Sequence, residues 1–196
     1  MKKLLFLIAC GILVACSSTK YEGTEATAKL NPVYVTDKAT FQLLATSQVE
    51  KAVDAVQHFK AQFGDKSFES DVLLIADAQK LSLTILNDFG ATMGELNYNN
   101  DLVVFDSALF PKALKAEYIV ADVQFCLYRV DALQKALADS GLRFVVSVED
   151  SVDGKSVETR SIFDGEKEIA HIEKSIGKIT YSNYLRDYAY TLQGDF

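Results

Sequence analysis

The stretch Leu81-Ser82-Leu83-Thr84-Ile85 decides the fold class, because apolar and polar residues alternate in it without a break. This period of two is typical of a β-strand with one face in the core and the other toward solvent. Downstream, Asn99-Asn100-Asp101 separates two further apolar stretches and predicts a hairpin turn. Upstream, Gly64-Asp65-Lys66-Ser67 predicts a second hairpin in the same way. The middle of the chain is therefore predicted to form antiparallel β-structure.

The C-terminal third continues the alternation. Four apolar residues would share one face of a strand that ends at Asp153-Gly154: Leu142, Phe144, Val146 and Val148. Further strands are predicted over residues 156–163, 167–174 and 179–184. Three residues would share one face of a last strand: Tyr188, Tyr190 and Leu192.

Two segments have the spacing of helices instead. The first follows Pro111 and carries one stripe of apolar residues: Leu114, Tyr118, Ala121 and Phe125. In the second, Asp131-Ala132-Leu133-Gln134 resembles a capping box and Ser140-Gly141 supplies the stop. Residues 49–63 fit either a helix or a strand, and we favour a strand from Ala55 onward. These patterns predict a single, mainly β (α+β) domain over residues 41–196.

The composition excludes several classes of function. The chain has 196 residues, 49% of them hydrophobic, which suits one domain with a sizeable core. Its 27 acidic residues outnumber its 20 basic residues, and this balance argues against nucleic acid, which needs a clustered basic face. Two His and three Cys leave little material for a zinc site.

Residues 1–15 have the pattern of a secretory signal peptide. A short positive start, Met1-Lys2-Lys3, precedes an apolar run from Leu4 to Val14. This run is shorter than the about twenty residues that span a bilayer as a helix. The run ends in Leu13-Val14-Ala15-Cys16, which resembles the lipobox of bacterial lipoproteins. The resemblance implies that Cys16 receives a diacylglycerol and that the signal peptide is cut before it.

Two alternatives concern this N-terminal segment. Leu7-Ile8-Ala9-Cys10 is a second lipobox-like match, but cleavage there would leave a very short apolar segment. The second alternative is an ordinary signal peptide in which Cys16 occurs by chance and is not lipidated. By resemblance to the sorting rule of enteric bacteria, Ser17 favours the periplasmic face of the outer membrane. Residues 16–40 are predicted to form the lipidated N-terminus and a tether.

Side chains that could carry catalysis are few. No G-x-S-x-G elbow is present to activate a serine. His58 and His171 fall in alternating patterns on predicted strands and are interpreted as sheet-face residues. Cys126 lies in an apolar stretch and is interpreted as an inert core thiol. We therefore expect no enzymatic activity, no cofactor and no metal site.

A family resemblance covers the chain from Phe41 to Leu192. It rests on Leu81-x-Leu83-x-Ile85-x-Asn87-Asp88-Phe89-Gly90, on Gly94-x-Leu96, on Leu102-Val103-Val104 and on a helical segment leading to Leu133. In this order of elements the chain resembles LolB, the outer-membrane lipoprotein that receives lipoproteins from a periplasmic carrier. It is still more similar to an uncharacterised family of LolB-like lipoproteins, often encoded beside aryl polyene and fatty-acid-type synthesis genes.

The resemblance implies a fold and a site. The fold would be a curved antiparallel sheet or half-barrel of about 9–11 strands, lidded by two or three helices over an apolar cavity that holds acyl chains. Phe89 would occupy the protruding loop that LolB uses in membrane delivery. Chosen by pattern alone, the expected lining residues are Leu83, Ile85, Leu96, Val104, Tyr118 and Phe125. Asp88 stands where LolB has a proline, so a related lipid-handling role is expected rather than that of LolB itself.

Two functions from different classes follow. The first is a non-enzymatic lipoprotein that binds or transfers a lipid or lipidated cargo, with the membrane and a periplasmic carrier protein as partners. The alternative is a structural or assembly accessory lipoprotein that docks a protein partner and has a filled core. Composition does not separate them, because aromatic and aliphatic residues fill an ordinary β core and an acyl cavity equally well.

Overall fold

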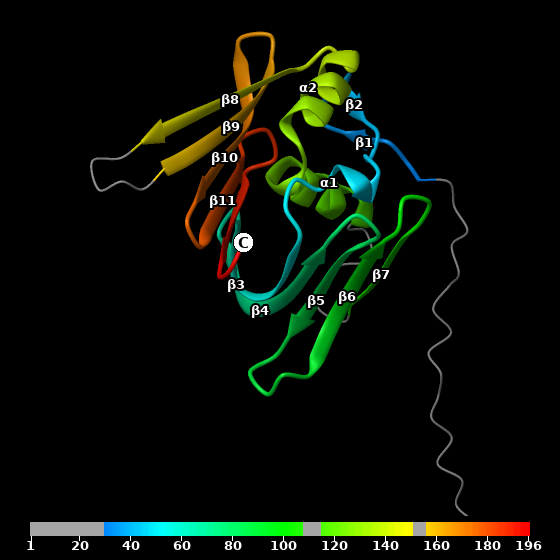
Figure 1. The fold of residues 1–196 in the computed structure, drawn as a ribbon, viewed down its shortest axis with the longest axis vertical. Helices are drawn as coiled ribbons and strands as arrows, with labels where there is room; N and C mark the ends of the chain where they lie inside the picture. Colours follow the sequence, from blue (N-terminus) through cyan, green and yellow to red (C-terminus); the bar gives the residue numbers. More distant parts are fainter. Residues whose placement is uncertain (1–29, 108–114, 151–155) are drawn as a thin grey trace, which may run out of the picture.

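The computed structural model describes residues 30–107, 115–150 and 156–196. Twelve strands and two α-helices succeed one another in these residues (Figure 1). The first half contains β1 (Val33–Tyr34), β2 (Thr40–Phe41), a 3-10 turn (Thr46–Gln48), β3 (Val53–Phe63), β4 (Lys66–Ala76), β5 (Leu81–Leu86), β6 (Thr92–Tyr98) and β7 (Val103–Ser107). The second contains α1 (Ala116–Leu127), α2 (Val130–Asp139), β8 (Arg143–Asp150), β9 (Ser156–Asp164), β10 (Lys167–Ser175), β11 (Lys178–Asn183) and β12 (Tyr188–Gln193).

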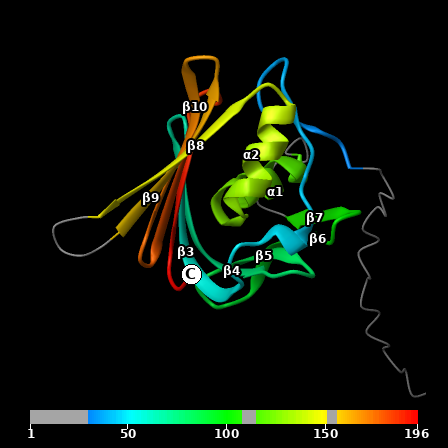
Figure 2. The same ribbon diagram turned by 45° about the horizontal axis from the view of Figure 1, so that its top comes forward.

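Ten of the strands form one antiparallel sheet in the order β7-β6-β5-β4-β3-β12-β11-β10-β9-β8. Consecutive strands pair within β3–β7 and within β8–β12, and the pairing of β12 with β3 joins the two halves. β7 and β8 remain edges, so the described strands do not close into a barrel. Figure 2 shows the sheet curving around both helices, which lie on its concave side. The predicted mainly β fold, with a curved antiparallel sheet and few helices, is confirmed.

The core lies between this concave face and the helices. Leu133 and Leu137 of α2 are fully buried, as is Leu81 of β5. Burial of each such side chain contributes about 1.5–3 kcal/mol. Phe125 of α1 packs against Phe41 of β2, with ring centroids 4.9 Å apart. Of the helices in the described residues, none is long and apolar enough to cross a membrane.

A buried cation ties α1 to the sheet. Arg160 of β9 is fully buried, and its Nη1 donates to the carbonyl oxygens of Phe125 at 3.2 Å and of Tyr128 at 2.7 Å. These carbonyls end α1, where the helix dipole favours a positive charge. Arg160 also forms ion pairs with Glu50, at 2.6 Å, and with Glu158. The C-terminal end of α1 is therefore held in place by hydrogen bonds and charge.

Part of the segment expected as a tether packs against the domain. Val33 of β1 and Val35 are buried in the core, and β1 pairs with β2. The packed body therefore begins upstream of residue 41. Residues 1–29, which include Cys16, lie outside the described residues.

The start of α2 differs from its prediction. The helix begins at Val130 rather than after a capping Asp131, and no side chain caps it among the described residues. Asp131 instead binds Arg129 at 2.6 Å. The expected capping box does not form because Arg129 is the N-cap residue, which places Asp131 inside the first turn of the helix.

Candidate functional site

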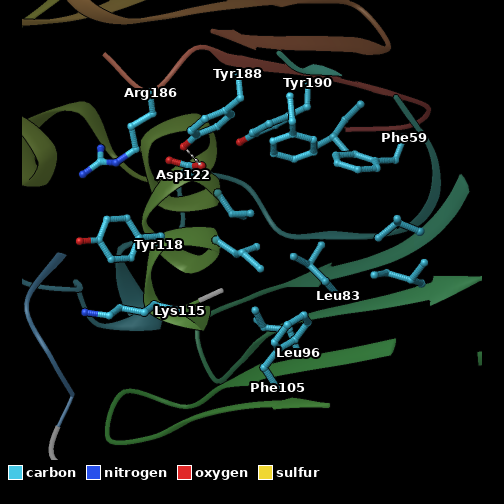
Figure 3. Close-up of a pocket in the computed structure, with 16 residues that line it drawn as sticks. Phe59, Leu83, Leu96, Phe105, Lys115, Tyr118, Asp122, Arg186, Tyr188 and Tyr190 are labelled. Carbon is cyan, nitrogen blue, oxygen red and sulfur yellow. Dashed lines mark hydrogen bonds between the residues drawn. The ribbon is translucent and has the colours of Figure 1, made fainter. Parts of the chain in front are cut away.

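An apolar cavity of about 550 Å³ lies between the concave face of the sheet and helix α1 (Figure 3). This volume is within the range of about 300–1,000 Å³ that small-molecule sites occupy. The sheet contributes Phe59, Phe63, Val72, Leu83, Ile85, Leu96, Phe105, Tyr188, Tyr190 and Leu192. Helix α1 and the residue before it contribute Lys115, Tyr118, Ile119, Asp122 and Val123, and Arg186 comes from the turn before β12.

Strand register brings the aliphatic and aromatic floor of the cavity together. Leu83 of β5 lies directly opposite Leu96 of β6, and Leu96 lies opposite Phe105 of β7. Ile85 lies opposite Val72 of β4. Residues directly opposite each other in antiparallel strands share a face, so the pairings form continuous apolar rows. The period of two in the sequence thus becomes one wall of the cavity.

A second wall is aromatic and depends on the pairing of β12 with β3. Tyr188 lies opposite Phe63, and their rings stack with centroids 5.7 Å apart. Phe59 and Tyr190 are diagonal neighbours on the same two strands, also with ring centroids 5.7 Å apart. Such pairs contribute about 0.5–1.5 kcal/mol beyond area burial. These ring contacts hold the four aromatic side chains along one side of the cavity.

Four of the six residues expected to line a cavity lie in the wall of this one, and two do not. Leu83, Ile85, Leu96 and Tyr118 line the cavity. Val104 does not: it is 50% exposed and lies opposite the exposed Asn97, on the outer face of the sheet. Its neighbour Phe105 faces the cavity instead, because a shift of one residue along a strand moves a side chain to the other face.

Phe125 also does not line this cavity. It is only 3% exposed and contacts Phe41 in the filled part of the core. Of the predicted helical stripe, Leu114 lies outside the described residues, Tyr118 lines the cavity, and Ala121, like Phe125, is buried in the core. The prediction missed Phe59, Phe63, Tyr188 and Tyr190. Their alternation indicated strands, but it carried no signal that β3 and β12, the first and last strands of this sheet in chain order, would pair.

One carboxyl group stands in the cavity wall. The Tyr188 hydroxyl donates to Asp122 Oδ2 at 2.5 Å (Figure 3). Burial raises the pKa of Asp122 to about 7, although Tyr188, Tyr181 and the charge of Arg186 act in the opposite direction. The carboxyl group is therefore largely protonated in mildly acidic solution, and the cavity wall is then close to neutral at this point.

Two cations border the cavity where it meets solvent. Lys115 and Arg186 are both exposed, and the Arg186 guanidinium lies over the Tyr118 ring at 5.0 Å from its centroid. In Figure 3 the polar ends of Lys115, Tyr118 and Arg186 point to the same side, away from Phe59 and Leu83. The cavity is thus an apolar space with a basic rim.

Phe89 lies at the tip of the turn between β5 and β6 and is 95% exposed. The Asn87 side chain holds the turn by accepting the N–H groups of Phe89 at 3.0 Å and Ala91 at 2.9 Å. Gly90 follows with φ of +74°, a conformation that favours glycine. The turn therefore holds the backbone of Phe89 where its phenyl ring is exposed to solvent.

The remaining reactive side chains lie away from the cavity lining. His58 binds Glu69 at 2.9 Å and Asp71 at 3.1 Å across β3 and β4, and His171 binds Glu168 at 2.8 Å. No three His, Cys, Asp or Glu side chains come together as a metal site within residues 30–107, 115–150 and 156–196.

Cys126 is fully buried, and burial raises the pKa of its thiol to about 12. A thiol in this state is unreactive near neutral pH, because the thiolate is the nucleophile.

Comparison with protein-family models identifies the family of this chain. The model of the family described as "Protein of unknown function (DUF3261)" matches residues 54–194. The match runs from the start of β3 to the end of β12, so it includes the ten-stranded sheet and both helices. The chain belongs to this family. No curated protein matches the chain.

Proposed function

We propose that this member of the DUF3261 family is a non-enzymatic lipoprotein that binds or transfers a lipid or lipidated cargo at the periplasmic face of the outer membrane. The observation that carries the proposal is the apolar cavity of about 550 Å³ between α1 and the concave sheet. A cavity of this size and lining supports lipid binding over the alternative, an assembly accessory with a filled core.

The energetics of such a cavity suit an acyl chain. Each buried methylene contributes about 0.8 kcal/mol, so even part of a chain gives useful affinity. The cavity meets solvent at its basic rim, which provides a route for the chain to enter. Transfer then needs only that the cargo binds less tightly here than in the bilayer.

The resemblance to LolB supports the same proposal. Helices lie on the concave side of a curved antiparallel sheet, which is the arrangement that this resemblance implies. In the proposal, this sheet acts as a half-barrel and the helices act as its lid. Anchoring would come from diacylglycerol on Cys16 after removal of residues 1–15. A periplasmic carrier protein would deliver the cargo.

Phe89 is the proposed contact with the membrane. Phe89 is a large apolar side chain that is 95% exposed, so its transfer from water to the acyl boundary of a membrane would be favourable. Asn87 already holds the backbone of the turn, so little backbone conformational entropy would be lost when the ring inserts.

Native mass spectrometry of the chain produced without residues 1–16 tests the proposal. We expect co-purified lipid, and binding of a fluorescent fatty acid after the lipid is extracted. Leu83→Trp places a larger ring in the cavity and should abolish binding. Val104→Trp makes the same change of size on the outer face of the sheet and is the matched control. Absence of both co-purified lipid and fatty-acid binding in the unmodified chain would refute the proposal.

A further inference from the structure

The charged groups of the cavity wall point to the chemistry of its ligand. Sixteen residues line the cavity, and three of them have acidic or basic side chains that can carry a charge near neutral pH: Lys115, Asp122 and Arg186. The chain as a whole has a formal net charge of -7, so its overall field repels anions. Two cations at the rim of an apolar cavity therefore stand out against an acidic background.

Arg186 is held in position but keeps hydrogen-bonding capacity. Its Nη1 donates to the carbonyl oxygen of Val35 at 3.4 Å, and its Nη2 donates to the carbonyl oxygen of Tyr34. The guanidinium also lies over the Tyr118 ring. A guanidinium has five N–H donors, so three remain for another acceptor. Carboxylates and phosphates match this planar group best.

Lys115 directly precedes α1, and its carbonyl oxygen accepts a hydrogen bond from the backbone N–H of Tyr118 at 3.1 Å, which keeps the two residues close together. Arg186, Tyr118 and Lys115 therefore form a row along the rim, as Figure 3 shows. Lys115 is exposed and forms no ion pair within the described parts of the chain. Its ammonium group is free to bind an acceptor at the end of an apolar chain.

Asp122 does not cancel this charge. Its carboxyl group accepts a hydrogen bond from Tyr188, and burial raises its pKa to about 7. Even when Asp122 is ionised, the three groups together keep one positive charge.

We propose that the cavity selects amphiphiles with an anionic head, a carboxylate or a phosphate monoester, bound by Arg186 and Lys115 while the apolar chain occupies the interior. This inference rests on the proposed lipid-binding function and specifies its ligand class. The geometry separates the two parts of such a ligand, because the polar ends of the rim residues point away from Phe59 and Leu83.

Competition among ligands with one chain and different heads tests the inference. The purified full-length protein, held in an amphipathic polymer instead of detergent, is loaded with a neutral fluorescent naphthylamine probe at pH 8. Dodecanoate, dodecyl phosphate, dodecanol and dodecyltrimethylammonium then compete for the site. We expect the two anions to displace the probe at lower concentration than the alcohol, and the cation to be the weakest competitor.

Variants locate the head group. Lys115→Met should weaken dodecanoate binding by about threefold to fivefold, the effect of one exposed charge, and leave dodecanol unchanged. Arg186→Gln should weaken it by about tenfold, because a charged hydrogen bond is lost. Lys135→Met, on the exposed face of α2, is the matched control and should change neither. If Arg186→Gln fails to fold, the competition series with the wild-type protein still tests the preference for an anionic head group.

The outcomes distinguish the inference from the function on which it rests. If dodecanol competes as well as dodecanoate, the anionic-head inference fails while lipid binding stands. If neither the probe nor any competitor binds, both fail. Stronger competition by dodecanoate identifies a fatty-acid type of ligand, and stronger competition by dodecyl phosphate identifies a phosphate-headed lipid; either result supports the inference.

Discussion

Asp122 offers a quantitative test of the cavity, because its carboxyl group stands in an apolar wall. The Tyr188 hydroxyl and the Arg186 charge favour the ionised form, but burial outweighs them and raises the pKa from 3.8 to about 7. Asp122→Asn keeps an oxygen that can accept the Tyr188 hydrogen bond and removes the titration. The difference in stability between the two proteins therefore reports on the ionisation of Asp122.

The sign follows from proton binding. Below pH 3.8 the carboxyl group is protonated in both the folded and the unfolded chain, so it has no effect on stability. Between 3.8 and about 7 the unfolded chain releases the proton while the folded chain keeps it, so stability falls as pH rises. The full destabilisation, reached above pH 7, is about 4 kcal/mol at 1.36 kcal/mol per unit of pKa.

Urea unfolding at pH 5 and at pH 8 measures this effect. The free energy of unfolding of Asp122→Asn, relative to wild type, should rise by about 3 kcal/mol between the two pH values, because part of the loss has already occurred at pH 5. Asp131→Asn is the control: its ion pair with Arg129 lowers the pKa of Asp131, so its titration lies below pH 5. An Asp122→Asn difference that is the same at both pH values would refute the assignment of a protonated carboxyl group to the cavity wall.

Three further predictions concern other parts of the molecule. Phe89→Glu should leave stability unchanged and reduce binding to phospholipid vesicles in a flotation assay, whereas Ile176→Glu, on another exposed turn, should not reduce it. Arg160→Met should lower the free energy of urea unfolding by about 3 kcal/mol, since it leaves carbonyls and carboxylates without their partner, and Lys174→Met, at the partly exposed edge of the same cluster, should lower it much less. Gly94→Ala should cost about 1–3 kcal/mol, because the added Cβ would lie 2.6 Å from the hydroxyl oxygen of the residue opposite it on β7; an unchanged unfolding midpoint would contradict this close approach.

Local sequence pattern was sufficient for the hairpins of the sheet. The turn at Gly64 and the turn at Asn100 both form where predicted, with positive φ at each residue. These turns depend on residues that are adjacent in the chain, and turn chemistry is visible at that range. The pairing of Tyr188 with Phe63 joins two strands that are far apart in the sequence, and no local pattern encodes it.

The residues of the candidate site show the same difference between what local pattern reveals and what depends on long-range strand pairing. Leu83 and Leu96 were identified because alternation reveals which residues share a face. Val104 was assigned to the wrong face because Leu102-Val103-Val104-Phe105 is apolar throughout and so carries no phase. Tyr190 was recognised as a strand residue, yet its place in the cavity wall follows only from the contact between β12 and β3.

Helix α1 explains why hydropathy could not distinguish a filled core from a cavity. One part of its surface, with Val120 and Phe125, is buried in the filled core, while Tyr118 and Ile119 border the cavity. Both parts are apolar, so the sequence shows one apolar stripe although some of its residues pack in the core and others border the cavity. At the C-terminal end of the helix, Arg160 donates hydrogen bonds to the carbonyl oxygens of Phe125 and Tyr128. The helix that forms one wall of the cavity is therefore also held by a buried cation that is not among the lining residues, and a hydropathy pattern does not reveal such a contact.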